Sequence, residues 1–334
     1  MLNEGEATAS PVLNTPKTSN SSPRPSTSGR LFPFQQNGLW GYKNSSGQVV
    51  IEATLSYAGE FKESIAFASR DGLFGIISRN GIWLVEPQWT DALPFSENKA
   101  AVKSGSKWGY INTDYELVID YMFDEAYSFS CGRALVKDSS LGDGYGYIDI
   151  QGNLAASAKW RKANSFSEDK AFVKSGSTGY IINKIGEPVS TLQSDETGTE
   201  FCEGFALIHA DNEYFFMNSR FRQAFNETYE DALPFSSSYA AIKNEDELWG
   251  YIYTDGEIRI EPTYKDAKSF STTDKLAAVC DTESGLWGYI NKSGKVVIPF
   301  EYDEADMFLN GYAKVKKSST YYILNTSGNT VVLY

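Results

Sequence analysis

The sequence predicts an all-β protein built from a tandem repeat, and three observations lead to this fold class. The triplet Trp-Gly-Tyr returns in near-copies every 33 to 38 residues, a turn phrase follows each triplet, and one Phe recurs between neighbouring triplets. A fixed period of this length is typical of repeat architectures, in which each unit buries its apolar face against its neighbours. We expect about nine three-stranded antiparallel meanders forming an open twisted β-array, with a closed ring resembling a β-propeller as the alternative.

The triplet and its turn phrase place two strands of each unit. The clearest triplets begin at Trp40, Trp108, Trp249 and Trp287, and weaker ones begin at Phe74, Tyr145, Thr178, Tyr214 and Tyr321. The turn phrase starts with Asn, Asp or Ser in most copies and ends with Gly in seven of nine, as in Asn44 to Gly47, whereas Tyr115 and Phe221 replace the Gly. A hairpin loop that ends in a residue with positive φ favours Gly. Flanking β-branched and aromatic runs then predict strands.

A second phrase, centred on a recurring Phe, completes the unit. This Phe stands between every pair of triplets, at Phe61, Phe95, Phe129, Phe166, Phe201, Phe235, Phe270 and Phe308. The residue three positions earlier is always small, Gly198 in one copy and Ala in the others, which implies a close backbone approach. A run that opens with Ala follows and predicts the third strand. We therefore expect the Phe and the small residue to form the joint between neighbouring units.

Composition limits the partners. The formal net charge is −13, with 43 acidic against 30 basic side chains, and phosphate binding needs a basic face, so nucleic acid is not expected. A basic protein is the partner that this charge favours. The three cysteines, Cys131, Cys202 and Cys280, have no metal-ligand spacing, so neither a disulfide framework, a metal site nor a cofactor is expected.

The chain divides into two regions. Residues 1–30 are rich in Ser, Thr and Pro and predict a disordered tail, whereas residues 31–334 hold the repeat array. The first residues lack a basic start and an apolar run, and no stretch of about 18 apolar residues predicts a membrane span. The sequence as written indicates a cytoplasmic protein without membrane insertion, and secretion or association with the envelope remains an alternative.

Several recurring positions together resemble the bacterial WG-repeat family. The resemblance rests on the Trp-Gly-Tyr-Ile-Asn opening, the Gly turn, the run from Val297 to Asp303 and the Phe-Ser pair with its following Ala-x-Val-Lys, and it covers residues 31–334. It implies an interaction module without family-wide catalytic residues. Units five and six depart most, because Thr178 replaces the Trp, one residue is inserted before Gly186 and Tyr214 opens a triplet without Gly.

Candidate binding residues lie where the repeat breaks its own pattern, because structural demand no longer dictates the residue there. Arg161 and Lys162 are basic where other copies are acidic or neutral, and they flank Trp160, although the register places Trp160 in the core. His209, the only histidine, occupies a slot that is Lys in five other copies, which predicts a solvent-facing residue. These four residues are the predicted interaction site.

The sequence favours a protein that is not an enzyme. A second histidine is absent, and acidic residues repeat four positions before the Phe in most units, which indicates a structural role, since a glycosidase needs its carboxylate pair once. We expect a protein-protein interaction scaffold whose acidic surface binds a basic partner, such as a neutralised toxin or an envelope or secretion component. The alternative is a carbohydrate or cell-wall binding module that stacks sugars on exposed Tyr and Trp rings.

Overall fold

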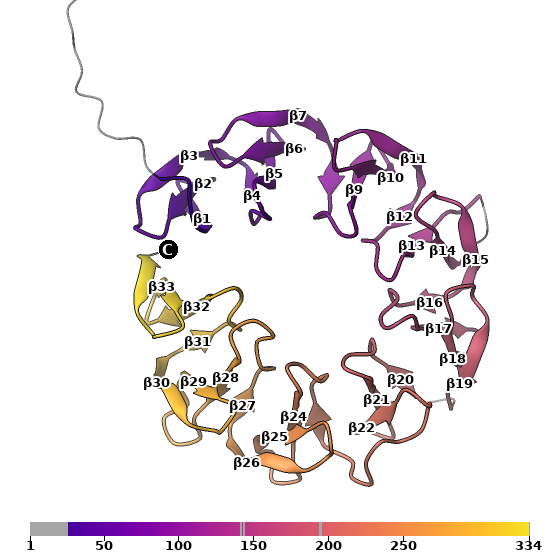
Figure 1. Ribbon diagram of the computed structural model, residues 1–334, viewed down its shortest axis with the longest axis vertical. Coiled ribbons are helices and arrows are strands. Elements are labelled where there is room, and N and C mark those ends of the chain that lie inside the picture. Colours follow the sequence, from indigo (N-terminus) through magenta and orange to yellow (C-terminus); the bar gives the residue numbers. More distant parts are fainter. Residues whose placement is uncertain (1–25, 141, 143, 194–195, 334) are drawn as a thin grey trace, which may run out of the picture.

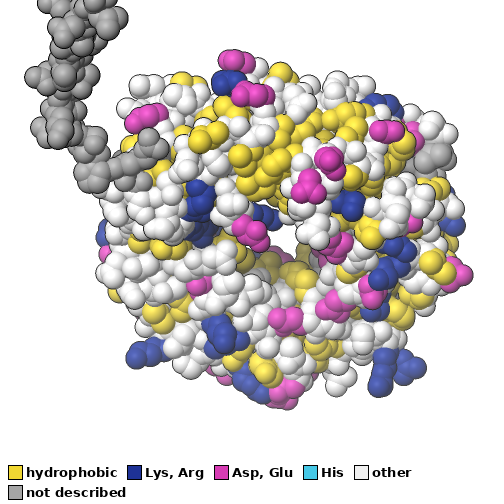
Figure 2. All heavy atoms as spheres, turned by 45° about the horizontal axis from the view of Figure 1, so that its top comes forward, with side chains coloured by type: hydrophobic (Ala, Val, Ile, Leu, Met, Phe, Trp, Pro, Cys, Tyr) yellow, Lys and Arg dark blue, Asp and Glu magenta, His cyan; other side chains and the backbone are white. Residues whose placement is uncertain are grey.

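The fold is a closed ring of nine small antiparallel sheets (Figure 1). The computed structural model describes residues 26–140, 142, 144–193 and 196–333. Most of the expected tail at residues 1–30 therefore lies outside the described residues. We number the sheets as blades 1 to 9 in chain order. The space-filling view shows that the centre of the ring is open (Figure 2).

Most blades contain a short strand, then an inner, a middle and an outer strand. Blade 1 has β1 (Leu31–Gln36), β2 (Leu39–Asn44) and β3 (Val49–Leu55); blade 2 has β4 (Tyr57–Ala58), β5 (Ile65–Arg70), β6 (Leu73–Ser78) and β7 (Trp83–Trp89); blade 3 has β8 (Asp91–Ala92), β9 (Lys99–Ser104), β10 (Lys107–Asn112) and β11 (Leu117–Phe123). Blade 4 has β12 (Glu125–Ala126), β13 (Ala134–Lys137), β14 (Tyr145–Ile148) and β15 (Leu154–Trp160); blade 5 has β16 (Lys162–Ala163), β17 (Ala171–Ser175), β18 (Thr178–Ile182) and β19 (Pro188–Thr191); blade 6 has β20 (Thr197–Gly198), β21 (Phe205–Ala210) and β22 (Glu213–Asn218). Blade 7 has β23 (Asp231–Ala232), β24 (Tyr239–Lys243), β25 (Trp249–Tyr253) and β26 (Ile258–Tyr264); blade 8 has β27 (Asp266–Ala267), β28 (Leu276–Cys280), β29 (Trp287–Asn291) and β30 (Val296–Tyr302); blade 9 has β31 (Glu304–Ala305), β32 (Tyr312–Lys317), β33 (Thr320–Asn325) and β34 (Thr330–Leu333).

The predicted all-β class, antiparallel meanders and number of units are confirmed, but the predicted open array is wrong. The sheets form a nine-bladed β-propeller, with short strands such as β4 toward the centre and outer strands such as β7 on the circumference (Figure 1). The three-stranded unit also gains a fourth strand in most blades, because two residues of the predicted loop pair with the inner strand, as Glu125 pairs with Lys137.

The ring closes by side-chain packing rather than by a shared strand. Every strand of blade 1 comes from the start of the array and every strand of blade 9 from its end. Phe32 on β1 packs with Ile323 and Val332 of blade 9, and its ring meets that of Tyr312 edge to face at 5.0 Å. The ring therefore closes without a strand that is shared between the two ends of the array.

The core lies in the seams between blades. One buried cluster, for example, joins Tyr110 and Phe123 of blade 3 to Phe129 and Val136 of blade 4. Each sheet is too small to bury its apolar side chains alone, so neighbouring blades must stack to exclude water. A substitution in a seam can therefore change how two neighbouring blades pack and thereby alter the surface above them.

The triplet Gly is required by the bulge at which the middle strand meets the outer strand. The pairing of β10 with β11 shifts register between Trp108 and Tyr110, and a Cβ on Gly109 would lie 2.6 Å from the carbonyl oxygen of Ile119. The triplet Gly therefore allows a close approach between two backbones of the same blade. The turn phrase also has its expected geometry, since Tyr115 and Phe221, which replace Gly, both have positive φ.

The register of blade 5 differs from the predicted alignment. Gly179 pairs with Lys174, as Trp108 pairs with Lys103 in blade 3, so Gly179 occupies the Trp position and Ile181 the Tyr position. Thr178 pairs with Ser175 at the preceding position. No inserted residue before Gly186 is then needed, because the one-residue offset lies in the triplet itself.

Each blade presents one edge to each face of the ring. In blade 4, Glu125 at the start of β12 pairs with Lys137 at the end of β13, and Tyr145 at the start of β14 pairs with Trp160 at the end of β15. The turns from inner to middle strand and the links between blades therefore share one face, which we call the link face. The loops from short to inner strand and the turns from middle to outer strand share the opposite face, which we call the loop face.

Candidate interaction surfaces

A tyrosine and a phenylalanine join most pairs of neighbouring blades. The triplet Tyr of one blade donates its hydroxyl hydrogen to a carbonyl oxygen two residues before the recurring Phe of the next blade. Five seams have this bond, formed by Tyr42 to Gly59, Tyr110 to Tyr127, Tyr147 to Asn164, Tyr251 to Lys268 and Tyr289 to Asp306, at 2.6 to 2.9 Å. In the same seams the two rings lie 4.7 to 5.0 Å apart. The recurring Phe is thus part of an inter-blade joint, as predicted.

Two seams replace this joint with a different one. Ile76 and Ile181 occupy the Tyr position in blades 2 and 5, and their partners on the inner strand are Phe67 and Phe172. Phe67 stacks on Phe95 with ring centres 5.7 Å apart, and Phe172 stacks on Phe201 at the same distance. The aromatic contact to the next blade is retained, but it comes from the neighbouring strand and has no tyrosine hydroxyl.

The two exceptional seams differ at the small residue. A Cβ on Gly198 would lie 2.2 Å from Cε1 of Phe172, so Phe172 fills the space that a methyl group would take, and Phe201 is 1% exposed. The seam between blades 2 and 3 has Ala92 at this position, and Phe95 is half-buried. Phe67 is also more exposed than its counterpart, at 9% against 5% for Phe172, so the seam between blades 2 and 3 is the less tightly closed of the two.

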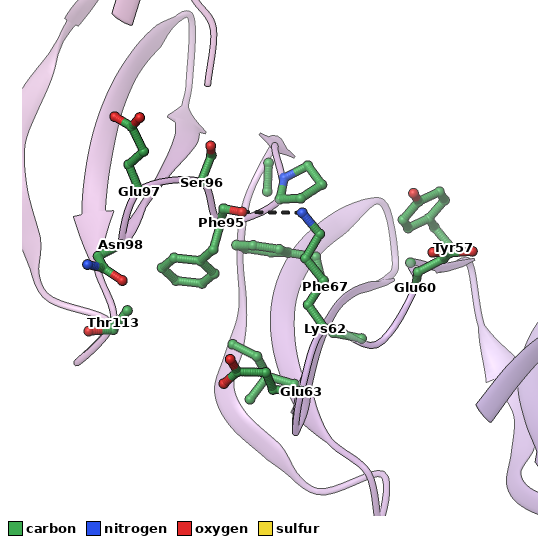
Figure 3. A pocket seen from close by; sticks show the side chains of 15 residues that line it. Tyr57, Glu60, Lys62, Glu63, Phe67, Phe95, Ser96, Glu97, Asn98 and Thr113 are labelled. Carbon is green, nitrogen blue, oxygen red and sulfur yellow. Dashed lines mark hydrogen bonds between the residues drawn. The ribbon is translucent and has the colours of Figure 1, made fainter. Parts of the chain in front are cut away.

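A cavity of about 500 Å³ occupies this open seam (Figure 3). Phe67 and Phe95 form its aromatic wall, and Tyr57 from β4 lies at one side. The cavity lies on the loop face, because it is lined by the loops between short and inner strands and by Thr113, on the turn after β10. A volume in this range is typical of pockets that bind ligands.

The polar rim of the cavity is mainly acidic. Among the described residues, Glu60, Glu63 and Glu97 line it together with one cation, Lys62, which donates a hydrogen bond to the carbonyl oxygen of Phe95 at 3.4 Å. Glu60 is paired with Arg30 at 2.9 Å. Glu97 accepts a hydrogen bond from the amide of Gly132 at 2.9 Å, which fixes it to the next blade. The rim therefore offers carboxylate groups beside an apolar wall.

The link face carries a strong negative charge over blades 6 to 8. The described turns and links from Asp211 to Glu283 include ten acidic residues on this face: Asp211, Glu213, Glu230, Asp231, Glu245, Asp246, Glu247, Asp266, Asp281 and Glu283. We call this set the acidic arc. Two lysines, Lys243 and Lys265, lie along the same stretch, and Lys243 pairs with Glu247 at 3.7 Å. Most of the arc is solvent-exposed and its negative charge is largely uncompensated.

The predicted basic residues lie on the same face, at the link between blades 4 and 5. Arg161 and Lys162 are exposed, and Lys162 pairs in register with Lys174 of β17. Trp160 is 2% exposed, and the ammonium group of Lys159 lies 4.7 Å from its ring. Trp160 thus offers no free ring face, while its two predicted neighbours form a basic patch with Lys159 and Lys174.

His209 lies apart from that patch. It is the penultimate residue of the inner strand of blade 6, where it pairs with Thr197, and its ring centre is 4.6 Å from that of Tyr214. It is half-buried rather than fully exposed. The four predicted residues thus share the link face, but the structure does not bring His209 together with the other three.

Within the described residues, no group of His, Cys, Asp and Glu could hold a metal ion. Burial and the carboxylates of Glu200, Glu168 and Glu203 raise the pKa of the Cys202 thiol. A raised pKa keeps the thiol protonated and poorly nucleophilic near neutral pH. The described part of the chain also contains no apolar helix of membrane-spanning length.

Sequence reasoning missed the cavity. The visible departure was Ile76 in the Tyr position of a triplet that begins at Phe74. Its consequence depends on Phe67 as the cross-strand neighbour and on Ala92 in the next blade. These three residues come from three strands, so no single sequence motif marks the cavity.

The geometry defines the protein as a nine-bladed β-propeller assembled from short tandem repeats. The family described as "WG containing repeat" matches residues 40–74, 74–108, 108–140, 145–178, 249–281 and 287–321. The chain therefore belongs to this family. Residues 179–248, which hold the two departing units, lie outside the matched repeats. The repeats and the propeller fold together suggest a protein-interaction scaffold.

Solved structures resemble the chain in fold. A structure described as the eukaryotic initiation factor is 9% identical, covers 91% of this chain and 96% of its own, and has a TM-score of 0.63. BamB from Moraxella catarrhalis is 11% identical and covers 90% of this chain and 97% of its own, with a TM-score of 0.45. No curated protein matches the chain significantly in sequence. At such low identities the similarity concerns the fold alone.

Proposed function

We propose that this protein is a non-enzymatic scaffold whose link face binds a basic protein partner. The observation that carries the proposal is the separation of charge on this face. The acidic arc covers blades 6 to 8, whereas Lys159, Arg161, Lys162 and Lys174 form a basic patch at the link between blades 4 and 5. Such a distribution attracts a basic surface to one half of the face and repels it from the other.

The acidic arc suits recognition because its side chains stand on exposed turns of a rigid ring. Glu245, Asp246 and Glu247 are consecutive exposed residues in the turn between β24 and β25. Clusters of one sign raise the association rate of an oppositely charged partner and lose this effect as salt screens them. A basic toxin or a basic component of the envelope or secretion machinery is a partner of this kind.

The burial of the tryptophans argues against the carbohydrate alternative. All seven tryptophans lie in the described residues, and Trp89, Trp108, Trp160 and Trp249 are buried. The others, Trp40, Trp83 and Trp287, are half-buried. Stacking on sugar needs an open ring face, so the best residues for that function are largely covered.

Charge reversal in the acidic arc tests the proposal. The immobilised double variant Glu245→Lys with Asp246→Lys should lose captured proteins from a native lysate, relative to the wild type. A matched control, Glu257→Lys with Glu261→Lys, makes the same charge change at exposed positions elsewhere in blade 7. The proteins lost only from the arc variant, identified by mass spectrometry, should be basic. An unchanged captured set, or loss of acidic proteins, would contradict the proposal.

The basic patch has its own test. Arg161→Glu with Lys162→Glu should change the geometry of the cross-links that the same proteins make to the link face, because the basic patch repels a basic surface and so orients the partner. Unchanged capture and unchanged cross-links would remove Arg161 and Lys162 from the interaction surface and leave the acidic arc as the only contact.

A further inference from the structure

We propose that the cavity between blades 2 and 3 is a second binding site, which takes an aromatic side chain flanked by arginine or lysine in an extended segment of a partner protein. The site lies on the loop face, opposite the acidic arc, and does not depend on the function proposed for that arc. Its walls, its rim and its origin each support this occupant.

The wall of the cavity fits an aromatic ring. Phe67 and Phe95 stack with their ring planes inclined by 24°, and Phe95 is half-buried, while six of the other seven recurring phenylalanines are at most 3% exposed. Aromatic rings associate best in offset-stacked or edge-to-face arrangements. A ligand ring in the cavity can therefore extend the existing pair and cover the exposed part of Phe95.

The rim fits a positive charge on either side of that ring. Figure 3 shows Glu63 and Glu97 on different sides of the two phenylalanines. The described hydrogen bonds use one oxygen of Glu97 for the Gly132 amide, and they leave the carboxylate of exposed Glu63 without a partner. Lys62, which also lines the cavity, is directed across the seam to the carbonyl oxygen of Phe95. Arginine or lysine next to the inserted ring would find carboxylates on the rim.

The origin of the cavity indicates a specific site rather than loose packing. In blade 3 the cross-strand pair at the same position is Ala101 and Tyr110, and the tyrosine fills the seam and bonds to the next blade. Blade 2 has Phe67 and Ile76 there instead, so both positions differ together. Phe67 keeps an aromatic contact to blade 3, whereas Ile76 leaves unfilled the space that tyrosine fills in other seams.

The test uses a blocked, fluorescently labelled pentapeptide of sequence Gly-Arg-Trp-Arg-Gly and the full-length protein. Fluorescence anisotropy should show binding that weakens at least tenfold when Gly replaces Trp in the peptide or Gln replaces both arginines. The variant Phe67→Ala with Ile76→Tyr installs the pair of blade 3, should close the cavity, and should weaken binding at least tenfold. The matched control Phe172→Ala with Ile181→Tyr makes the same change between blades 5 and 6. Its affinity for the peptide should stay within twofold of the wild-type value.

Two further variants keep the inference testable if the double variant fails to fold. Thr113→Trp places a bulky ring on an exposed turn residue that lines the cavity and should block entry. Glu63→Gln should weaken the affinity for the arginine peptide about threefold. It should leave unchanged the affinity for the peptide in which Gln replaces both arginines. The inference is overturned if the wild type does not bind the peptide, if folded cavity variants bind it normally, or if Glu245→Lys with Asp246→Lys abolishes binding while the cavity variants do not.

Discussion

The hydroxyl of Tyr110 donates a hydrogen bond to the carbonyl oxygen of Tyr127 at 2.9 Å, across the seam between blades 3 and 4. Tyr110 is fully buried, and its ring also meets that of Phe129 edge to face at 5.0 Å. One side chain thus supplies both the apolar and the polar contact between two blades. The same arrangement in four other seams makes it the repeated unit of ring assembly.

Removing this hydroxyl should destabilise the ring without opening the core. Tyr110→Phe keeps the ring contacts but leaves the carbonyl of Tyr127 without its donor, which costs about 1 to 2 kcal/mol. Urea unfolding should show this loss. The control Tyr127→Phe removes a hydroxyl from a side chain that is 39% exposed and should change the free energy of unfolding by less than about 0.5 kcal/mol. Equal effects of the two variants would contradict a special role for the seam bond.

The buried tyrosines also predict loss of stability at high pH. Burial raises the pKa of Tyr110, Tyr147, Tyr251 and Tyr289 above the usual value near 10. The folded state keeps these protons where the unfolded state loses them, so the stabilisation is complete below about pH 10 and declines as pH rises from there through the higher folded-state values. Urea unfolding at pH 8, 10 and 11 should give successively smaller free energies.

Absorbance at 295 nm provides the decisive readout for that prediction. Exposed tyrosines should ionise near pH 10 without unfolding, whereas the buried set should ionise only together with the loss of near-ultraviolet circular dichroism. Ionisation of all tyrosines in a protein that keeps its tertiary signal would show that the seams admit hydroxide without unfolding, and that burial does not hold these protons.

The sequence predicted the repeat, the strands and the joint at the recurring Phe because these features depend on local periods. Gly109 and Phe129 have counterparts in most copies, and each has a structural reason that recurs in most blades. Closure depends on something else, namely how the small rotations between successive blades add up around the axis. Phe32 and Tyr312 meet only once, and neither belongs to a repeated pattern that would reveal the contact.

The candidate surfaces were predictable to different degrees. The basic residues Arg161 and Lys162 stand out in an alignment of the units, and the structure exposes both. The acidic arc is less visible, because its residues come from three blades and gather on one face only when the ring forms. The cavity needed the pairing of Phe67 with Ile76, which no spacing in the sequence shows.

Gly198 should tolerate Ala poorly for a reason specific to its seam. The added Cβ would lie 2.2 Å from Cε1 of Phe172, so the ring must move, and overpacking of this kind costs about 1 to 3 kcal/mol. Phe172→Ala removes the obstacle at its own cost of about 3 to 5 kcal/mol. In that background Gly198→Ala should cost less than about 0.5 kcal/mol, so the double-mutant cycle should show strong coupling. Additive effects would mean that Phe172 does not occupy the space beside Gly198.

Arg30 should matter for ring closure more than an ordinary surface arginine does. Its guanidinium donates to the carbonyl of Leu309 in blade 9, pairs with Glu60 in blade 2 at 2.9 Å, and lies 5.6 Å from the rings of Phe32 and Tyr312. One side chain therefore contacts three blades at the seam where the two ends of the array meet. Arg30→Ala should lower the free energy of local opening at this seam by about 1.5 kcal/mol, which corresponds to about tenfold faster amide exchange.

Hydrogen exchange read by mass spectrometry would locate this effect. Peptides that cover β1 and β32 should exchange faster in Arg30→Ala, whereas β17 and β18, on the far side of the ring in Figure 1, should not change. Arg259→Ala is the matched control, because Arg259 also combines an ion pair, with Asp255 at 2.5 Å, and a contact to the Tyr253 ring, but within one blade. Unchanged exchange in every blade would mean that side-chain packing alone keeps this seam closed and that closure does not depend on Arg30. Faster exchange in every blade would mean that Arg30 has no specific role at this seam.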